Sequence, residues 1–171
     1  MELHGYRDED WAGSTTDQRS TSGFMSTLGS ASITWSSKKQ PTVALSSIET
    51  EYRGVAVTAC EVAWLCKLLM DLRLQVDREV VIYCDNLSSI QLGKNLVFHA
   101  RAKHIEVHYH FVRDQVLADD INLVYKSIEE QVANIFTKAL GAEKLCRLWT
   151  RLRALQLVSS SRGSVKMLSS P

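Results

Sequence analysis

Apolar and β-branched residues stand in short clusters among Ser, Thr and Gly through the first 40 residues of the chain. Clusters of this length, separated by turn-forming residues, predict β-strands. Strand cores are expected at Gly23-Phe24-Met25 and Ser32-Ile33-Thr34-Trp35, with turns at Gly13 and Gly29. The pattern therefore predicts a small antiparallel meander at this end of the chain.

A long helical pattern follows these strands. Ser46, with Glu49 three residues later, forms a capping box, which is a sequence signature of a helix start. Apolar residues then recur at helical spacing and would form one face of the helix: Ile48, Tyr52, Val55, Ala56, Ala59, Ala63, Cys66 and Met70. We therefore expect a long helix that begins after Ser46 and buries this face.

The run Val80-Val81-Ile82-Tyr83-Cys84 is continuously apolar and has the length of a strand. Such a run is typical of a central strand that is covered on both faces. It ends at Asp85, and polar residues at the carboxyl end of a central strand point into the binding crevice of an open α/β sheet. Asp85 is therefore a candidate functional residue by its position, although it could also cap the following helix.

The remaining predicted elements are four helices and one strand. In chain order, they are a helix at 90–96, a helix at 105–116, a strand at 121–125, a helix at 127–139 and a helix from 143 to about 158. Ser127 and Glu130 form the capping box of the third of these helices, and Gly141 is its expected C-cap. We expect an α/β domain over 1–141, a C-terminal helix over 142–158 and a disordered polar tail over 159–171.

Composition narrows the class of protein. With 171 residues, 45% of them hydrophobic, the chain can bury one core. A net charge of +1 excludes a strongly basic nucleic-acid binder but leaves local basic patches open. No apolar run approaches a membrane span, and no signal-peptide pattern is present, so an intracellular protein without a membrane anchor is expected. The four cysteines form no CxxC pair and predict buried free thiols: Cys60, Cys66, Cys84 and Cys146.

Two groups of acidic residues raise questions about chemistry. Asp8 and Asp10 would share one face of a strand while Glu9 points away, although a solvated acidic turn would have the same sequence. Glu49 and Glu51 lie on opposite borders of the apolar face of the long helix. Because Glu49 already serves as the acid of the capping box, Glu51 is the one without a structural assignment.

Several short segments occur in a fixed order along nearly the whole chain, to about residue 157. They include Gly5-Tyr6, Asp8, Asp10-Trp11-Ala12-Gly13, Trp35-Ser36-Ser37-Lys38-Lys39-Gln40, Tyr83-Cys84-Asp85-Asn86, His110-Phe111-Val112-Arg113 and Ala133-Asn134-Ile135-Phe136-Thr137-Lys138-Ala139-Leu140. In this order they closely resemble the ribonuclease H domain of copia-type LTR retrotransposon Pol polyproteins. Those polyproteins also contain protease, integrase and reverse transcriptase.

The resemblance implies a ribonuclease H-like fold, with a mixed five-stranded sheet flanked by helices, and Mg²⁺-dependent cleavage of the RNA strand of RNA/DNA hybrids. Mn²⁺ could substitute for Mg²⁺. By position, the catalytic residues would be Asp8, Glu51, Asp85 and Asn134, of which the three acids would bind metal. The family has Asp where this chain has Asn134, and an amide oxygen can ligate a metal but contributes no charge. The family also has a small residue where this chain has Arg7.

The resemblance further implies an RNA/DNA hybrid as substrate, a reverse transcriptase domain as partner and a cytoplasmic location in an intact element. Basic side chains could contact backbone phosphates, although a solvated surface role is equally open for each: Lys38, Lys39, Arg101, Lys103 and Arg113. The alternative function is that of a degenerate domain, which folds and binds nucleic acid but cleaves weakly or not at all. Asn134 and Arg7 both favour that alternative.

Overall fold

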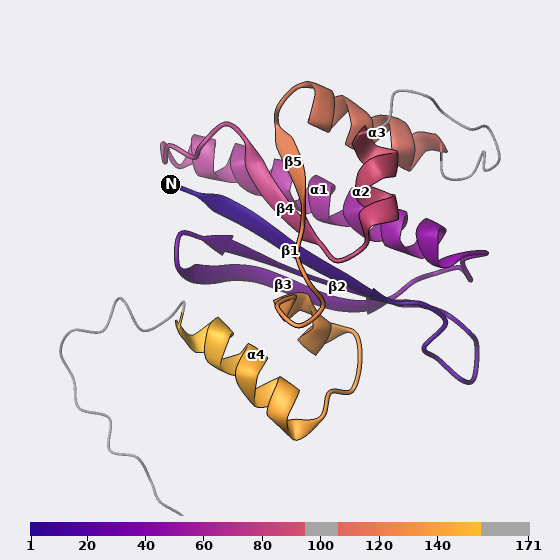
Figure 1. The fold of residues 1–171 in the computed structure, drawn as a ribbon. Coiled ribbons are helices and arrows are strands. Elements are labelled where there is room, and N and C mark those ends of the chain that lie inside the picture. Colours follow the sequence, from indigo (N-terminus) through magenta and orange to yellow (C-terminus); the bar gives the residue numbers. More distant parts are fainter. Residues whose placement is uncertain (95–105, 155–171) are drawn as a thin grey trace, which may run out of the picture.

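The computed structural model describes residues 1–94 and 106–154. Within them, five strands form one mixed sheet in the order β3-β2-β1-β4-β5 (Figure 1). The strands β1 (Leu3–Asp10), β2 (Thr21–Leu28) and β3 (Ala31–Lys39) are antiparallel neighbours. β4 (Val80–Cys84) pairs in parallel with β1 and with β5 (Ile121–Tyr125). The predicted meander, both later strands and the α/β class are confirmed.

Helices cover both faces of this sheet (Figure 1). On one side lie α1 (Ser47–Asp71), α2 (Leu87–Lys94) and α3 (Glu106–Leu117). On the other side lie the short 3₁₀ helix η2 (Val132–Phe136) and α4 (Ala142–Ala154). Within this part of the chain, none of the helices combines the length and the apolar character that crossing a membrane requires.

The start of α1 agrees with the sequence prediction. The side chain of Ser46 caps the helix by accepting a hydrogen bond from the N–H of Glu49 at 3.1 Å. The carboxylate of Glu49 accepts from the N–H of Leu45 at 2.9 Å, one residue before the position that a capping box uses. Ile48 and Met70, at the two ends of the predicted apolar face, are exposed, so the buried face of α1 is shorter than predicted.

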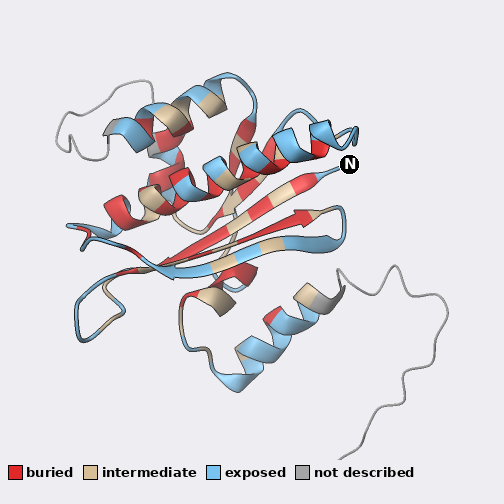
Figure 2. Cartoon of the chain, turned by 180° about the vertical axis from the view of Figure 1, so that it is seen from behind, coloured by how far each residue is buried: buried red, intermediate tan, exposed pale blue. Residues whose placement is uncertain are grey.

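Two apolar cores hold the sheet between its helices. The larger core, between the sheet and the helices α1 and α3, contains the fully buried residues Tyr52, Val55, Ile82, Val112 and Leu123. The smaller core, on the opposite face, joins Met25, Val132 and Leu148. Figure 2 shows that the edge strand β3 is largely exposed, whereas β1 and β4 are largely covered. The last residues of β1 and β4 are therefore held by packing on both faces of the sheet.

The prediction of a helix at 127–139 is wrong. The N–H of Glu130 donates to the backbone oxygen of Ser127 at 2.9 Å, and this bond closes a turn instead of starting a helix. The side-chain amide of Gln131 then donates to the backbone oxygen of Tyr83 at 3.0 Å and ties the chain to β4. Because this contact fixes the segment against the sheet, only the single short helix η2 forms there.

Two further expectations need correction. Gly141 is not a C-cap, because its backbone oxygen accepts from the N–H of Leu145 at 2.9 Å at the start of α4. All four cysteines are free thiols, as predicted, but only Cys84 is fully buried, and Cys60 and Cys146 are exposed.

Some expectations fall on residues outside the described ranges. They concern Arg101 and Lys103, the end of the C-terminal helix at 155–158, and the polar tail at 159–171.

Candidate active site at the ends of β1 and β4

The parallel pairing of β1 with β4 brings Asp8 and Asp85 together. Tyr6 of β1 pairs with Tyr83 of β4, and their rings lie on the same face, 4.9 Å apart. Continuing this register by two residues places Asp8 beside Asp85, because side chains two apart on a strand share a face. Two carboxylates that lie 77 positions apart in the chain thus meet at one edge of the sheet.

Asp8 is buried and its carboxylate already has donors. The hydroxyl of Thr137 donates to Oδ2, and the ammonium of Lys138 lies 3.2 Å from Oδ1 and 3.1 Å from Oδ2. Both donors directly follow η2, which packs closely on β2 at Gly23, where a Cβ would lie 2.6 Å from Cγ2 of Thr137. Sequence reasoning gave no role to Thr137 or Lys138, although both lie in a segment that carries the family resemblance.

Asp85 is partly buried and lies near several charges. Burial raises the pKa of Asp85, the charge on Asp8 raises it further, and the cations Arg7 and Lys138 lower it. Its Oδ1 is buried and has no hydrogen-bond partner among the described residues. Asn86, not Asp85, caps α2, because its side-chain oxygen accepts from a backbone N–H of the first turn at 3.1 Å. Asp85 is therefore left without a structural role in capping.

The carboxylate of Glu51 is paired with Arg7. The Nη2 atom of Arg7 forms an ion pair with Oε2 of Glu51, and Nη1 donates to the backbone oxygen of the same residue at 2.9 Å. The side chain of Arg7 is 0% exposed and that of Glu51 is 13% exposed. Glu51, which the family resemblance implies as a metal ligand, is thus paired with the cation Arg7.

Asn134 lies on η2 and is fully buried. Its side-chain amide donates to the backbone oxygen of Ile128 at 2.7 Å, and its Oδ1 has no hydrogen-bond partner among the described residues. Its backbone oxygen lies 3.3 Å from the hydroxyl of Thr137, which donates to Asp8. Asn134 is therefore connected to the carboxylate site through one side chain and presents an unpartnered oxygen.

Glu9 is a buried acid that sequence reasoning did not single out. It points away from the face of Asp8, as predicted, but into the space between β1 and α1 instead of into solvent. Its Oε2 accepts from the hydroxyl of Ser22 at 2.6 Å and from the amide of Gln40 at 3.2 Å. Burial raises the pKa of Glu9 to about 8, so this side chain is neutral near pH 7. A glycine inside a helix, Gly54, was the available sequence signal, because it leaves room for a neighbouring group.

Three of the residues predicted to contact phosphates lie in the described ranges, and their surroundings differ. Lys38 and Lys39 are exposed at the end of β3. The ammonium of Lys39 is 3.2 Å from Oδ1 of Asp17 and 3.0 Å from the hydroxyl of Ser14, whereas Lys38 has no ion pair among the described residues. Arg113 lies on α3, partly buried. Only Lys38 among these three is thus an exposed cation without a counter-ion in the described ranges.

These residues fit one divalent cation better than two. Among the described residues, no group of three or more His, Cys, Asp and Glu side chains is arranged to hold a metal ion. Asp8 and Asp85 lie at short range, and unpartnered buried oxygens on Asp85 and Asn134 are the hard ligands that Mg²⁺ prefers. Glu51 does not fit, because its partner Arg7 is fully buried and cannot move to solvent, whereas Lys138 beside Asp8 is 28% exposed and can leave that carboxylate.

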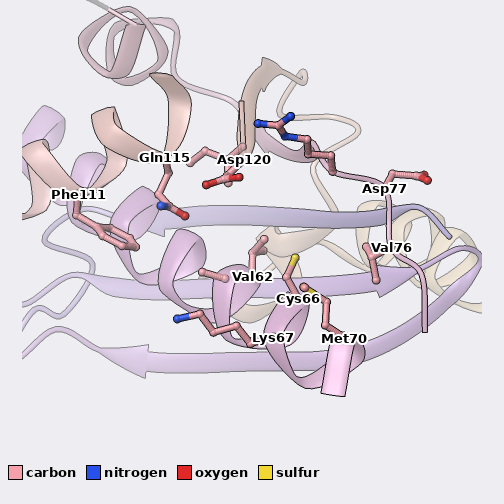
Figure 3. Close-up of a pocket in the computed structure, with 12 residues that line it drawn as sticks. Val62, Cys66, Lys67, Met70, Val76, Asp77, Phe111, Gln115 and Asp120 are labelled. Atoms are coloured by element: carbon pink, nitrogen blue, oxygen red, sulfur yellow. The ribbon is translucent and has the colours of Figure 1, made fainter. Parts of the chain in front are cut away.

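A separate hollow of about 360 Å³ lies between α1, α3 and the start of β5 (Figure 3). Apolar side chains line much of it, among them Val62, Met70 and Phe111, and the charged side chain of Asp120 faces it from the position just before β5. Because β5 runs parallel to β4, its start lies at the end of the sheet opposite to Asp85. The hollow therefore has no part in the carboxylate site.

Relatives of the chain are found among retrovirus-related Pol polyproteins. The chain is 41% identical over 167 residues to the Pol polyprotein from transposon RE2 of Arabidopsis thaliana, a match that covers 98% of the chain and 12% of the relative. It is 47% identical over 141 residues to that from transposon RE1 of the same plant, covering 82% and 10%. The protein from transposon TNT 1-94 of Nicotiana tabacum is 40% identical over 147 residues, covering 85% and 11%. The chain thus spans about a tenth of the length of these relatives, and no family model matches it.

Solved structures share the fold. The N-terminal RNase H domain of Rv2228c from Mycobacterium tuberculosis matches with a TM-score of 0.56 at 14% identity, over 93% of this chain and 99% of that one. LC11-RNase H1 in complex with an RNA/DNA hybrid also matches with a TM-score of 0.56 at 14% identity, over 80% and 94%. Together, the sequence relatives and the shared fold confirm the resemblance that the motifs predicted.

Proposed function

We propose that this chain, which is a ribonuclease H domain of the kind found in copia-type retrotransposon Pol polyproteins, binds RNA/DNA hybrids and cleaves their RNA strand with a divalent metal ion. The observation that carries the proposal is the meeting of Asp8 and Asp85 at the carboxyl ends of two parallel strands. The structural neighbour LC11-RNase H1 has been solved with an RNA/DNA hybrid, which supports this class of substrate. We also propose that the domain cleaves hybrids as part of a longer polyprotein that includes reverse transcriptase.

Asp8 and Asp85 would hold the metal ion, with the amide oxygen of Asn134 as a neutral ligand. Bringing a cation to this position would relieve the repulsion between the two aspartates and satisfy the unpartnered oxygens. When bound, Mg²⁺ or Mn²⁺ would supply the charge that polarises a phosphate and activates water. Lys138, whose side chain is 28% exposed beside Asp8, would offer a further positive charge to the phosphate backbone.

The test is cleavage of a hybrid with labelled RNA by the purified chain, with Mg²⁺ and with Mn²⁺. We expect nicks in the RNA strand, and a loss of at least about a hundredfold in rate in Asp85→Asn, because that variant removes a charged metal ligand. Asp71→Asn is the matched control, since Asp71 is exposed at the end of α1 and the chain that follows it contacts Met1, at the opposite end of β1 from Asp8. Absence of cleavage by the unmodified chain, or equal cleavage by Asp85→Asn, would contradict the proposal.

A second candidate function is hybrid binding without cleavage. Two observations favour it: Asn134 is neutral where the family has Asp, and Glu51 is held by Arg7. Asn134→Asp separates the candidates, because it restores a negative charge at the edge of the site. A large gain in cleavage would indicate an impaired active site. Binding of hybrid without cleavage in both forms would favour the non-enzymatic role.

A further inference from the structure

We infer that Arg7 is a built-in counter-ion of the carboxylate site, which holds Glu51 out of metal ligation and leaves the site with the capacity for one tightly bound divalent ion. The inference rests on the proposed function, since it concerns the same site. It differs from that proposal because it can be tested without nucleic acid and without catalysis.

The first support is geometric. The guanidinium of Arg7 is completely buried, and two of its nitrogens engage the same residue, one the carboxylate of Glu51 and one its backbone oxygen. The two contacts fix the orientation of the guanidinium relative to the first turns of α1. Among the described residues Glu51 is the acid that forms an ion pair with Arg7, while the Nε and Nη2 atoms of Arg7 make no hydrogen bond there. Moving Glu51 to a metal would leave a buried guanidinium uncompensated, which is unfavourable.

The second support is that the positive charge of Arg7 lies near the other predicted metal ligands. Arg7 directly precedes Asp8 on β1, pairs with Glu51 and lies within electrostatic range of Asp85. A guanidinium stays protonated at all ordinary pH values, so its charge is permanently present at the site. It thus performs continuously the neutralisation that a metal ion would perform only when bound.

The third support is the balance of charge. Asp8, Glu51 and Asp85 bring three negative charges, whereas Glu9 points away from the face of Asp8 and is held by Ser22 and Gln40. The cations Arg7 and Lys138 bring two positive charges to the same carboxylates, which leaves one net negative charge. Two divalent ions would therefore bind against a strong excess of positive charge. Attraction of a single ion remains, because Asp8 and Asp85 face each other and Asn134 adds an oxygen.

The experiment measures Mn²⁺ binding by calorimetry to the full chain in the absence of nucleic acid. Arg7→Ser removes the cation, and Arg7→Gln removes its charge while keeping most of its length. We expect both to bind Mn²⁺ at least about tenfold more tightly, since a unit charge at a few ångströms changes the attraction of a divalent ion by more than that factor. Both should also show a larger rise in melting temperature on addition of Mn²⁺ than the unmodified chain.

Arg53→Ser is the matched control. Arg53, on α1 itself, is also an ion-paired arginine, with its Nη2 atom 2.6 Å from Oε1 of Glu49 in the first turn of the helix. It touches none of the predicted ligands through a described ion pair, so its removal should leave Mn²⁺ affinity unchanged. Unchanged affinity in folded Arg7→Ser and Arg7→Gln as well would overturn the inference.

Glu51→Gln in the otherwise unmodified chain gives a second test that does not depend on the Arg7 variants folding. Glu51→Gln removes a charge from the site, so some weakening of Mn²⁺ binding is expected, but if Arg7 keeps Glu51 away from the metal this weakening is clearly smaller than that of Asp85→Asn, which removes both a charge and a ligand. Equal weakening by Glu51→Gln and Asp85→Asn would overturn the inference. Tighter Mn²⁺ binding by the Arg7 variants without any hybrid cleavage would leave the inference standing and contradict the proposed function. Cleavage of hybrid together with unchanged Mn²⁺ affinity in the Arg7 variants would contradict the inference and leave the proposed function standing.

Discussion

Glu9 lies between β1 and α1, where Gly54 leaves space for its carboxyl group, since a Cβ on Gly54 would collide with Oε1 of Glu9. Its other oxygen is satisfied by Ser22 and Gln40. Burial raises the pKa of Glu9 to about 8 from an ordinary value of 4.5, so the folded protein keeps a proton that the unfolded chain releases between these values. The folded state thus binds more protons than the unfolded state in this window, and its stability falls as the pH rises from about 4.5 to about 8.

Glu9→Gln removes this dependence, because the amide has nearly the same shape and no charge to bury. We expect the variant to become progressively more stable than the unmodified chain as the pH rises through this window, by on the order of a few kcal/mol at pH 8. Urea unfolding at several pH values measures the difference. Glu2→Gln, which changes an exposed glutamate, should give no such trend. Parallel pH profiles for Glu9→Gln and the unmodified chain would show that Glu9 is ionised in the fold.

Sequence reasoning at the residue scale found the positions of Asp8 and Asp85 but not their partners. Both were found from the family motifs, and Asp85 also from its place after the apolar run of β4, whereas the register of β1 on β4 that joins them is seen in the structure. The pairing of Glu51 with Arg7 depends on the directions of two side chains on elements that face each other, β1 and α1. No spacing rule within one element contains that information.

At the scale of elements, α1 could be predicted from local sequence, whereas η2 could not. α1 is long and its apolar residues repeat at helical spacing, so its start was predictable from Ser46 and its face from the pattern. η2 is set by tertiary contacts, chiefly the bond from Gln131 to the backbone of β4. A capping-box sequence there competes with these contacts and does not produce a helix.

Gly23 on β2 controls how closely η2 packs on the sheet. A Cβ at this position would lie 2.6 Å from Cγ2 of Thr137 and 2.9 Å from Cβ of Phe136. Gly23→Ala should therefore move η2 outward, remove Thr137 and Lys138 from Asp8, and destabilise the fold by about 1–3 kcal/mol. Thermal unfolding measures the loss, and faster hydrogen exchange of the amides at 132–138 would locate it.

Gly141→Ala is the control for this prediction, because a Cβ there meets nothing within 4 Å. We expect its stability to match that of the unmodified chain. A Gly23→Ala variant with unchanged stability and unchanged exchange at 132–138 would mean that η2 adapts to the added methyl group without leaving Asp8.

At the scale of the whole molecule, the strands and long helices followed from periodicity, but the arrangement of the sheet did not. That the sheet is mixed and five-stranded was implied by the family resemblance and is confirmed by the structure. That β4 and β5 run parallel to β1, and so bring Asp85 to Asp8, comes from the structure alone. Hydrophobic pattern specifies which residues are buried within one element. It does not specify which strands become neighbours, because several strand orders bury the same residues.

Net charge also acts at this scale, and it limits how the chain would hold the proposed RNA/DNA hybrid. A net charge of +1 cannot supply a general attraction to nucleic acid, so affinity must come from single exposed cations that are not already neutralised. Lys38 and Lys39 are a matched pair in this respect: they are adjacent on β3, but only Lys39 is bound to Asp17.

We expect Lys38→Ala to weaken binding of an RNA/DNA hybrid and to lower the slope of log affinity against log salt concentration by about one, whereas Lys39→Ala should change the slope much less. The reason is that Lys39 must first be released from Asp17 before it can neutralise a phosphate. Fluorescence anisotropy in EDTA, where cleavage is absent, measures both slopes. Equal slopes for the two variants would place the phosphate contacts elsewhere on the molecule, and a larger effect of Lys39→Ala would mean that the ion pair with Asp17 opens when hybrid binds.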